Sequence, residues 1–108
     1  MKNPTAIINY EKALLMAVQA LQRKDLQASR LLITDAIAFD ADAAEPQNLM
    51  GIFYELSGDE SLAKKHYRAA YALDPAFKPA SRNLERLVMP AWGSRRHEID
   101  FGIKPDYN

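Results

Sequence analysis

Residues 56–75 read LSGDESLAKKHYRAAYALDP, and a fainter version of this stretch occurs upstream in residues 22–40, QRKDLQASRLLITDAIAFD. A shift of 34 residues brings segments 8–41 and 42–75 into register. The matched positions are mostly small, apolar or acidic residues, the kinds that pack helices or begin them. The identical pairs are Glu11/Glu45, Leu15/Leu49, Met16/Met50, Asp25/Asp59, Ala36/Ala70, Ala38/Ala72 and Asp40/Asp74. This period predicts two copies of one structural unit.

Capping residues and apolar periodicity divide the chain into five predicted helices. Their starts are marked, in turn, by Asn3-Pro4, Asp25, a capping box of Asp42 and Glu45, Asp59 and Lys78. Their predicted ends lie near Arg23, Phe39, Ser57, Leu73 and Met89. Gly58 suits the left-handed end of the third helix, and Pro90 stops the fifth. The fold class is therefore predicted to be all-α, with an extended C-terminal tail over residues 90–108.

The second copy carries the small, aromatic and proline residues of a known pattern, at Gly51, Tyr54, Ala63, Tyr67, Ala70 and Pro75. In this order and spacing they resemble the tetratricopeptide repeat, a family of 34-residue helix pairs. The resemblance implies a right-handed superhelical array of antiparallel helix pairs. It implies one domain over residues 1–89, with repeats at 8–41 and 42–75 and a capping helix near 78–89. The sequence departs from the family pattern at Gln47 in the second repeat, and at Ala17, Ala20, Ser29 and Ala41 in the first.

The spacing of the pattern has a physical reason. Gly51, Ala63 and Ala70 are small where two antiparallel helices must approach closely, and we expect Tyr54 and Tyr67 to fill the volume between repeats. A single repeat cannot bury its own apolar face, so neighbours stack. Two repeats and a cap fall short of the usual minimum of about three. We therefore expect the missing contacts to come from the first helix, the tail or a second copy of the chain.

Composition argues against several classes of function. The chain has 14 basic and 14 acidic residues, so no net field favours nucleic acid or an anionic membrane. It has no cysteine, which excludes disulfides and thiolate metal sites. No apolar run approaches the roughly 20 residues that a membrane span needs. A cytoplasmic location is the default expectation.

The two histidines do not indicate a catalytic or metal site. His66 shares its place in the repeat with Leu32, so we expect it to have a packing role. His97 has Glu98 and Asp100 nearby, a combination common in solvated linkers. The sequence contains no phosphate-binding loop, nucleophile elbow or HExxH pattern. We predict that the chain is not an enzyme and uses no cofactor or metal.

The resemblance implies a concave surface, lined by the first helix of each pair, that receives a peptide or helix of a partner protein. The chain would then be an interaction module such as an adaptor, a scaffold or a chaperone-like protein. In this sequence the surface maps to Glu11, Leu14, Val18, Leu21, Asn48, Ile52, Glu55, Arg82 and Arg86. We expect its aliphatic members to bury side chains of the partner. We expect Arg82 and Arg86, one turn apart, to orient an acidic group together.

The tail is rich in large apolar residues, namely Trp92, Ile99, Phe101, Ile103 and Tyr107. Ile99, Phe101 and Ile103 occur at every second position, which favours an extended segment. Three arrangements are open: the tail docks on its own groove, crosses to a neighbour in a homodimer, or is offered to another protein. The alternative function is thus a self-assembling structural protein whose tail docks on its own or a neighbour's groove. The oligomeric state and the identity of a partner stay open.

Overall fold

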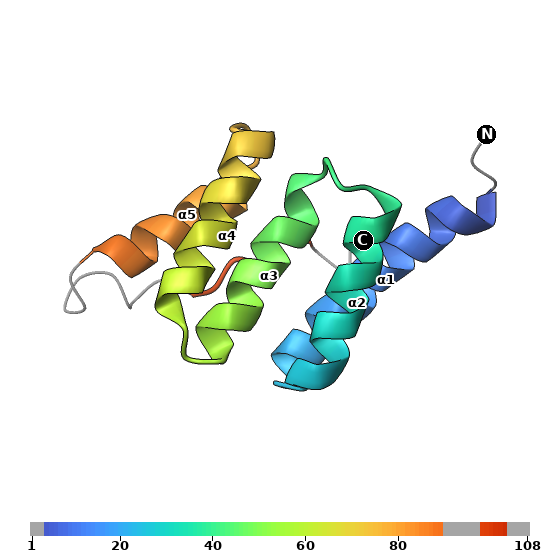
Figure 1. Cartoon of the computed structure of the whole chain (residues 1–108), viewed down its shortest axis with the longest axis horizontal. Helices are drawn as coiled ribbons and strands as arrows, with labels where there is room; N and C mark the ends of the chain where they lie inside the picture. The colour runs from blue at the N-terminus through green and yellow to red at the C-terminus, as the bar shows by residue number, and fades with distance from the viewer. Residues whose placement is uncertain (1–3, 90–97, 104–108) are drawn as a thin grey trace.

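The computed structural model of the chain describes residues 4–89 and 98–103, and side chains from Asn9 onward. Five α-helices make up most of this part (Figure 1), and it contains no β-strand. They are α1 (Pro4–Gln22), α2 (Leu26–Phe39), α3 (Ala44–Leu56), α4 (Glu60–Leu73) and α5 (Lys78–Val88). The prediction of an all-α fold with five helices is confirmed. The predicted tail residues Trp92 and Tyr107 lie outside the described residues.

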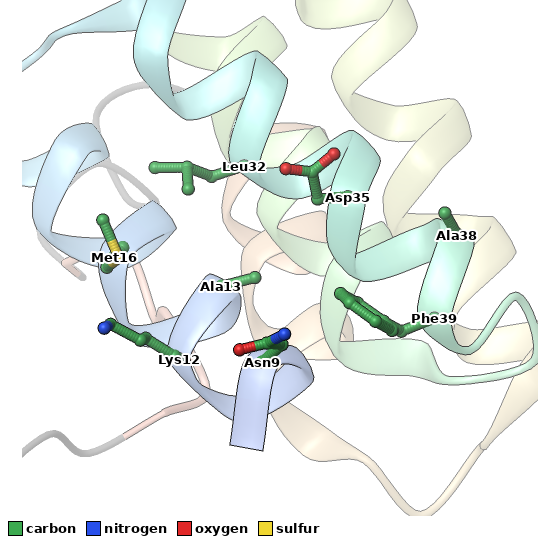
Figure 2. A pocket seen from close by; sticks show the side chains of 8 residues that line it. All are labelled: Asn9, Lys12, Ala13, Met16, Leu32, Asp35, Ala38 and Phe39. Carbon is green, nitrogen blue, oxygen red and sulfur yellow. The ribbon is translucent and has the colours of Figure 1, made fainter. Parts of the chain in front are cut away.

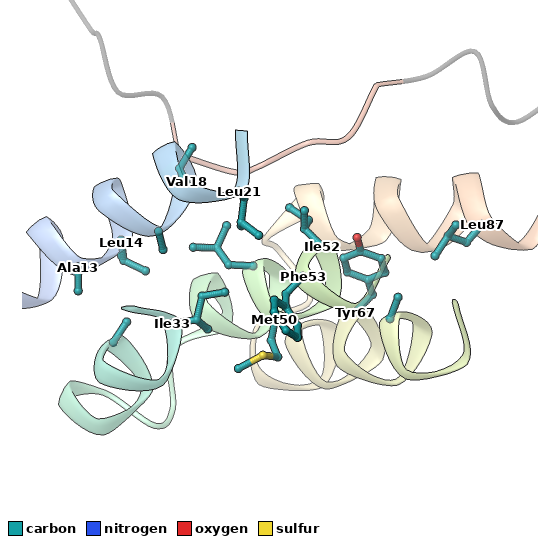
Figure 3. Close-up of a cluster of buried hydrophobic side chains, with 14 residues drawn as sticks. Ala13, Leu14, Val18, Leu21, Ile33, Met50, Ile52, Phe53, Tyr67 and Leu87 are labelled. Atoms are coloured by element: carbon teal, nitrogen blue, oxygen red, sulfur yellow. The ribbon is translucent and has the colours of Figure 1, made fainter. Parts of the chain in front are cut away.

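The helices form two antiparallel hairpins and a final helix. α1 packs on α2, and α3 packs on α4, while α5 continues against α4. The first hairpin joins the second through contacts of α2 and α1 with α3. As a result α1, α3 and α5 lie along one side of the molecule, and α2 and α4 lie along the other (Figure 3). The side with three helices carries the candidate site.

The turns inside the two hairpins have the same geometry, 34 residues apart. A residue with positive φ ends the first helix of each pair: Lys24 with φ 61° and Gly58 with φ 90°. One backbone hydrogen bond then closes each turn from the following aspartate to the helix behind it. These bonds are Asp25 N to Ala20 O at 2.8 Å and Asp59 N to Tyr54 O at 2.9 Å. The sequence period is therefore a period of backbone structure.

The ends of the second helix in each pair repeat as well. Asp25 and Asp59 cap the starts of α2 and α4, accepting hydrogen bonds from the backbone N–H groups of Ala28 and Leu62. Asp40 and Asp74 terminate these helices in nearly identical extended conformations, with φ of −152° at both. Their side chains then accept a hydrogen bond from the backbone N–H two residues ahead, at Asp42 and Ala76.

The start of α3 corrects the sequence-based expectation. The capping box of Asp42 and Glu45 is not formed, because the N-cap is Ala43, which has no side chain to cap with. The backbone N–H of Asp42 is instead bound by the carboxylate of Asp40, at 3.1 Å. This turn carries the chain one residue further before the helix begins. The predicted helix ends at Arg23, Ser57 and Met89 each lie one residue beyond the observed ends.

The core contains the close approach that the repeat pattern predicts. A Cβ atom on Gly51 of α3 would lie 2.4 Å from Cε1 of Tyr67 on α4. Tyr67 is fully buried, and Ala63 and Ala70 beside it on α4 are fully buried too. The glycine therefore lets the two helices approach closely, and the ring of Tyr67, labelled in Figure 3, fills the space next to it.

Candidate functional site

Residues 98–103 lie across the side of the molecule formed by α1, α3 and α5 (Figure 3). Ile99, Phe101 and Ile103 pack against the main hydrophobic core and are half-buried. These three residues alternate with Asp100 and Gly102 along the segment, which lies along the helices and turns at Gly102. The structure thus places three of the five predicted tail residues on the chain's own groove.

Two buried asparagines hold the backbone of this segment. Asn48 of α3 and Asn83 of α5 are both fully buried. Both amide nitrogens donate to the carbonyl oxygen of Asp100, at 3.0 and 2.9 Å. The backbone N–H of Asp100 donates in return to Asn83 Oδ1 at 2.9 Å. Asn48 Nδ2 also lies 3.3 Å from the carbonyl oxygen of Phe101. Asp100 is therefore held through both its backbone N–H group and its backbone carbonyl oxygen.

The two asparagines also bond each other, which helps to fix their orientation. Asn83 Nδ2 donates to Asn48 Oδ1 at 2.9 Å. Asn83 Oδ1 further accepts a hydrogen bond from Arg86 Nη2 at 3.3 Å. A buried amide with an unmade hydrogen bond is costly. The contacts that these amides make to residues 100–101 are therefore an integral part of the site.

The side chain of Asp100 adds two more contacts. Arg82 Nη1 lies 2.9 Å from Asp100 Oδ2, in an ion pair whose arginine side chain is 64% exposed. Asp100 Oδ1 accepts a hydrogen bond from the backbone N–H of Gly102 at 3.0 Å. Gly102 has a φ of 76°, which favours glycine. The aspartate thus fixes the turn of the segment at the next glycine.

A buried ionic cluster lies next to the asparagines and contacts Asn83 through Arg86. Arg86 of α5 forms a two-armed ion pair with Glu55 of α3, and only 5% and 11% of these side chains are exposed. The Tyr67 hydroxyl donates a hydrogen bond to Glu55 Oε1 at 2.7 Å. Burial raises the pKa of Tyr67, and the hydrogen bond to Glu55 raises the pKa of Arg86. Both groups therefore stay protonated, and the cluster acts as a fixed donor framework.

The predicted groove residues divide into three sets in the structure. Leu14, Val18, Leu21 and Ile52 are buried members of the hydrophobic core. Asn48, Glu55, Arg82 and Arg86 make the polar contacts just described. Glu11 is exposed on α1, away from these contacts.

In the structure Arg82 and Arg86 do not share one carboxylate. Arg82 pairs with Asp100 of the tail, whereas Arg86 pairs with Glu55 in the protein interior. The reason is burial: Arg86 lies on the inner face of α5, where only a carboxylate from the neighbouring helix reaches it.

Sequence reasoning missed Asn83 and the wall next to Gly102. Asn83 follows Ala80 by three residues and precedes Leu87 by four, so it lies on the buried face of α5. The sequence signal for Asn83 was therefore a polar residue at a position on the buried face of the helix. The wall is made by Phe77 and Pro79, which approach Gly102 closely. No local pattern indicates this contact, because it depends on where the tail docks.

His66 has the packing role expected for it. Its ring stacks on Tyr54, with ring centres 5.2 Å apart, and its Nδ1 lies 2.9 Å from Gln47 Oε1. Burial lowers the pKa of His66. The other histidine, His97, lies outside the described residues.

A second hollow lies between α1 and α2, away from the tail (Figure 2). It has a volume of about 430 Å³ and is lined partly by Met16 and Phe39, which are both partly exposed. Lys12 and Asp35 are the charged residues among those that line it.

Comparison of the chain with models of known families, with curated proteins and with solved structures found no match. No helix in the described part of the chain is long and apolar enough to cross a membrane. Function therefore has to follow from the geometry of the groove and of the segment that lies in it.

Proposed function

We propose that this chain is a protein-interaction module, resembling a short tetratricopeptide-repeat protein, that binds an extended protein segment in the groove formed by α1, α3 and α5. It acts by binding and not by catalysis. The observation that carries the proposal is the pair of buried asparagines, Asn48 and Asn83, bonded to the main chain of residues 100–101.

This arrangement suits peptide binding because main-chain recognition gives affinity while side-chain contacts give specificity. Apolar packing would be enough to hold a tail that never leaves the groove. Apolar residues at positions 48 and 83 would then avoid the free-energy cost of burying two amide groups. Buried amides are favourable only when every hydrogen bond is made. Their presence indicates a groove built for the backbone of an extended chain. The 34-residue repetition of turns and caps supports the resemblance to helix-pair repeats.

A peptide-display selection tests the proposal. The bait is the full-length chain with Phe101→Ser and Ile103→Ser, which removes two apolar anchors of the tail and frees the groove. We expect enriched peptides that compete with one another for a single site. The same bait with Asn83→Leu added is the matched control, and it should lose these peptides because the main-chain contacts are gone. Circular dichroism confirms that both baits are helical. The proposal fails if folded bait enriches no peptide, or if enrichment is unaffected by Asn83→Leu.

A further inference from the structure

We propose that the groove selects protein segments with the sequence aliphatic–Asp–aromatic–Gly–aliphatic, and that residues 99–103 of this chain are the built-in example of that ligand. This inference rests on the proposed function and names its partner class: an extended segment in which an acidic residue is followed, two positions later, by glycine. The partner displaces residues 98–103 from the groove.

Selection for aspartate follows from the contacts of Asp100. Its backbone N–H and carbonyl groups, on either side of the Cα atom, are held by Asn48 and Asn83, so the position of its Cβ is fixed as well. From there one carboxylate oxygen reaches Arg82 at 2.9 Å and the other reaches the N–H of Gly102 at 3.0 Å. Asparagine has the length but lacks the charge that pairs with Arg82. Glutamate has the charge, but its extra methylene moves the carboxylate away from the N–H group two residues ahead.

Selection for glycine has two independent causes. The φ of 76° at Gly102 is unfavourable for residues with a side chain. A Cβ atom there would also lie 2.6 Å from Cζ of Phe77 and 3.2 Å from Pro79. Pro79 is held by the start of α5 and has little freedom to move. A segment with a larger residue at this position must therefore move away from Phe77 and Pro79, and it loses the contacts that the neighbouring residues of the segment make.

The segment is placed so that it can be exchanged. None of the residues 98–103 is fully buried, and the Arg82 side chain that holds Asp100 is largely exposed. The segment can leave without opening the helix pairs beneath it. A hollow of about 380 Å³ lies alongside it, bounded by Pro79 and Arg82. An incoming segment has access to the groove from that side.

The covalent link between the segment and the rest of the chain determines how tightly a free peptide must bind in order to displace the segment. A segment joined to its site by a short linker acts at an effective concentration on the order of millimolar. A free peptide of the same sequence must compete with it. The wild-type chain should therefore bind such a peptide more weakly than a chain whose own segment is disabled.

The test uses a fluorescein-labelled peptide with the sequence of residues 98–103, EIDFGI, and measures its binding by fluorescence anisotropy. The receptors are the wild-type full-length chain and the full-length chain carrying Phe101→Ser and Ile103→Ser. We expect the substituted chain to bind at least about tenfold more tightly than the wild type. Gly102→Ala in the full-length chain is a second receptor. It leaves both apolar anchors in place and serves if the double substitution does not fold.

Peptide variants then test the selectivity. Gly102→Ala in the peptide should weaken binding at least about tenfold, because strain and steric clash add. Asp100→Asn in the peptide should weaken it about threefold, as expected for a largely exposed ion pair. That loss should vanish on a receptor that also carries Arg82→Gln. Glu98→Gln in the peptide, at an exposed position, is the matched control and should bind unchanged.

The outcomes separate this inference from the proposed function. If peptides bind but tolerate Gly102→Ala and Asp100→Asn, the selectivity is wrong and the peptide-binding function stands. If EIDFGI does not bind a folded receptor while display enriches unrelated, Asn83-dependent peptides, the inference again fails alone. If display on the folded bait enriches nothing that depends on Asn83, both are overturned.

Discussion

Gly51 shows how closely the two helices of the second pair are packed. A methyl group at this position would lie 2.4 Å from the ring of Tyr67, which is fully buried and hydrogen-bonded to Glu55. We expect Gly51→Ala to lower the free energy of unfolding by about 2 kcal/mol, because overpacking costs more than the roughly 1 kcal/mol that alanine gains in a helix. Chemical denaturation of the wild type and the variant measures the difference.

The same prediction has an internal control. In a Tyr67→Leu background the ring is gone, so Gly51→Ala should be neutral or stabilising there. The two substitutions should therefore couple strongly in a double-mutant cycle. Equal effects of Gly51→Ala in both backgrounds would show that the ring is not the obstacle.

Arg82 and Arg86 are one turn apart on α5 but differ in environment. We expect Arg86→Leu to cost about 3 kcal/mol or more of unfolding free energy, because it leaves the carboxylate of Glu55 buried and without its ion pair. Arg82→Leu should cost less than about 1 kcal/mol, because its pair with Asp100 is largely exposed. Denaturant titrations of both variants measure this contrast.

A second substitution distinguishes lost pairing from lost packing at Arg86. If the stranded charge causes the loss, Glu55→Gln added to Arg86→Leu should restore part of the stability. Equal costs for the two arginine variants, or no recovery in the double variant, would contradict the assigned environments.

At the scale of single residues, the sequence predicts contacts within one helix pair better than contacts between residues far apart in the chain. The small residue at Gly51 and the ring at Tyr67 follow from the repeat pattern, which encodes the spacing within one helix pair. The ion pair of Glu55 with Arg86 joins residues 31 positions apart and belongs to the contact between α3 and α5. Two arginines at i and i+4 look equivalent in sequence. Only the packing of α5 decides which one is buried.

The helix-pair turns offer a test at the scale of the element. Lys24 and Gly58 occupy equivalent positions, both with positive φ. Lysine is strained in this conformation, by about 1 kcal/mol, and glycine is not. We expect Lys24→Gly to raise the free energy of unfolding by up to about 1 kcal/mol and Gly58→Lys to lower it by a similar amount. Thermal unfolding of the two reciprocal variants measures both effects.

Steric contacts do not complicate the substitution at position 58. In the described part of the chain, no atom outside Gly58 and its two chain neighbours lies within 4 Å of a Cβ built there, so the cost is one of backbone conformation. A destabilising Lys24→Gly, or a neutral Gly58→Lys, would show that the two turns are not energetically equivalent.

Element boundaries were predictable where a local cap decides them. Asp25 and Asp59 start α2 and α4 as the sequence indicates, since each aspartate bonds the backbone three residues ahead. The start of α3 was not predictable in this way. The carboxylate of Asp40 binds the N–H of Asp42 first, and the competing turn prevents the capping box.

At the scale of the whole molecule, residues 98–103 cover part of the core formed by the two helix pairs and α5. The sequence indicated both the deficit and the tail's apolar residues, but left open whose groove the tail would occupy. Of the deciding contacts, Asn83 is signalled only by its place on the buried face of α5, and the wall at Phe77 and Pro79 is signalled by no local pattern. They are set by how α5 lies against α3, and local sequence does not encode that arrangement.

The tail docked in its own groove leads to a prediction about association. We expect the wild-type chain to have the mass of one chain in light scattering over a wide range of concentrations. Phe101→Ser with Ile103→Ser should lower its unfolding free energy by about 2 kcal/mol, because two half-buried side chains no longer cover the core. The uncovered apolar surface should also promote association of the variant, with a mass that rises with concentration.

Glu98→Gln is the matched control, because it changes the charge of the segment at an exposed position and leaves the anchors intact. It should match the wild type in mass and stability. A different result would follow if the segment crossed to a neighbour. The wild type would then have the mass of a dimer, its stability would rise with concentration, and the double substitution would convert it to a monomer. The direction of the mass change thus decides whether the groove is filled by its own chain or by a second copy.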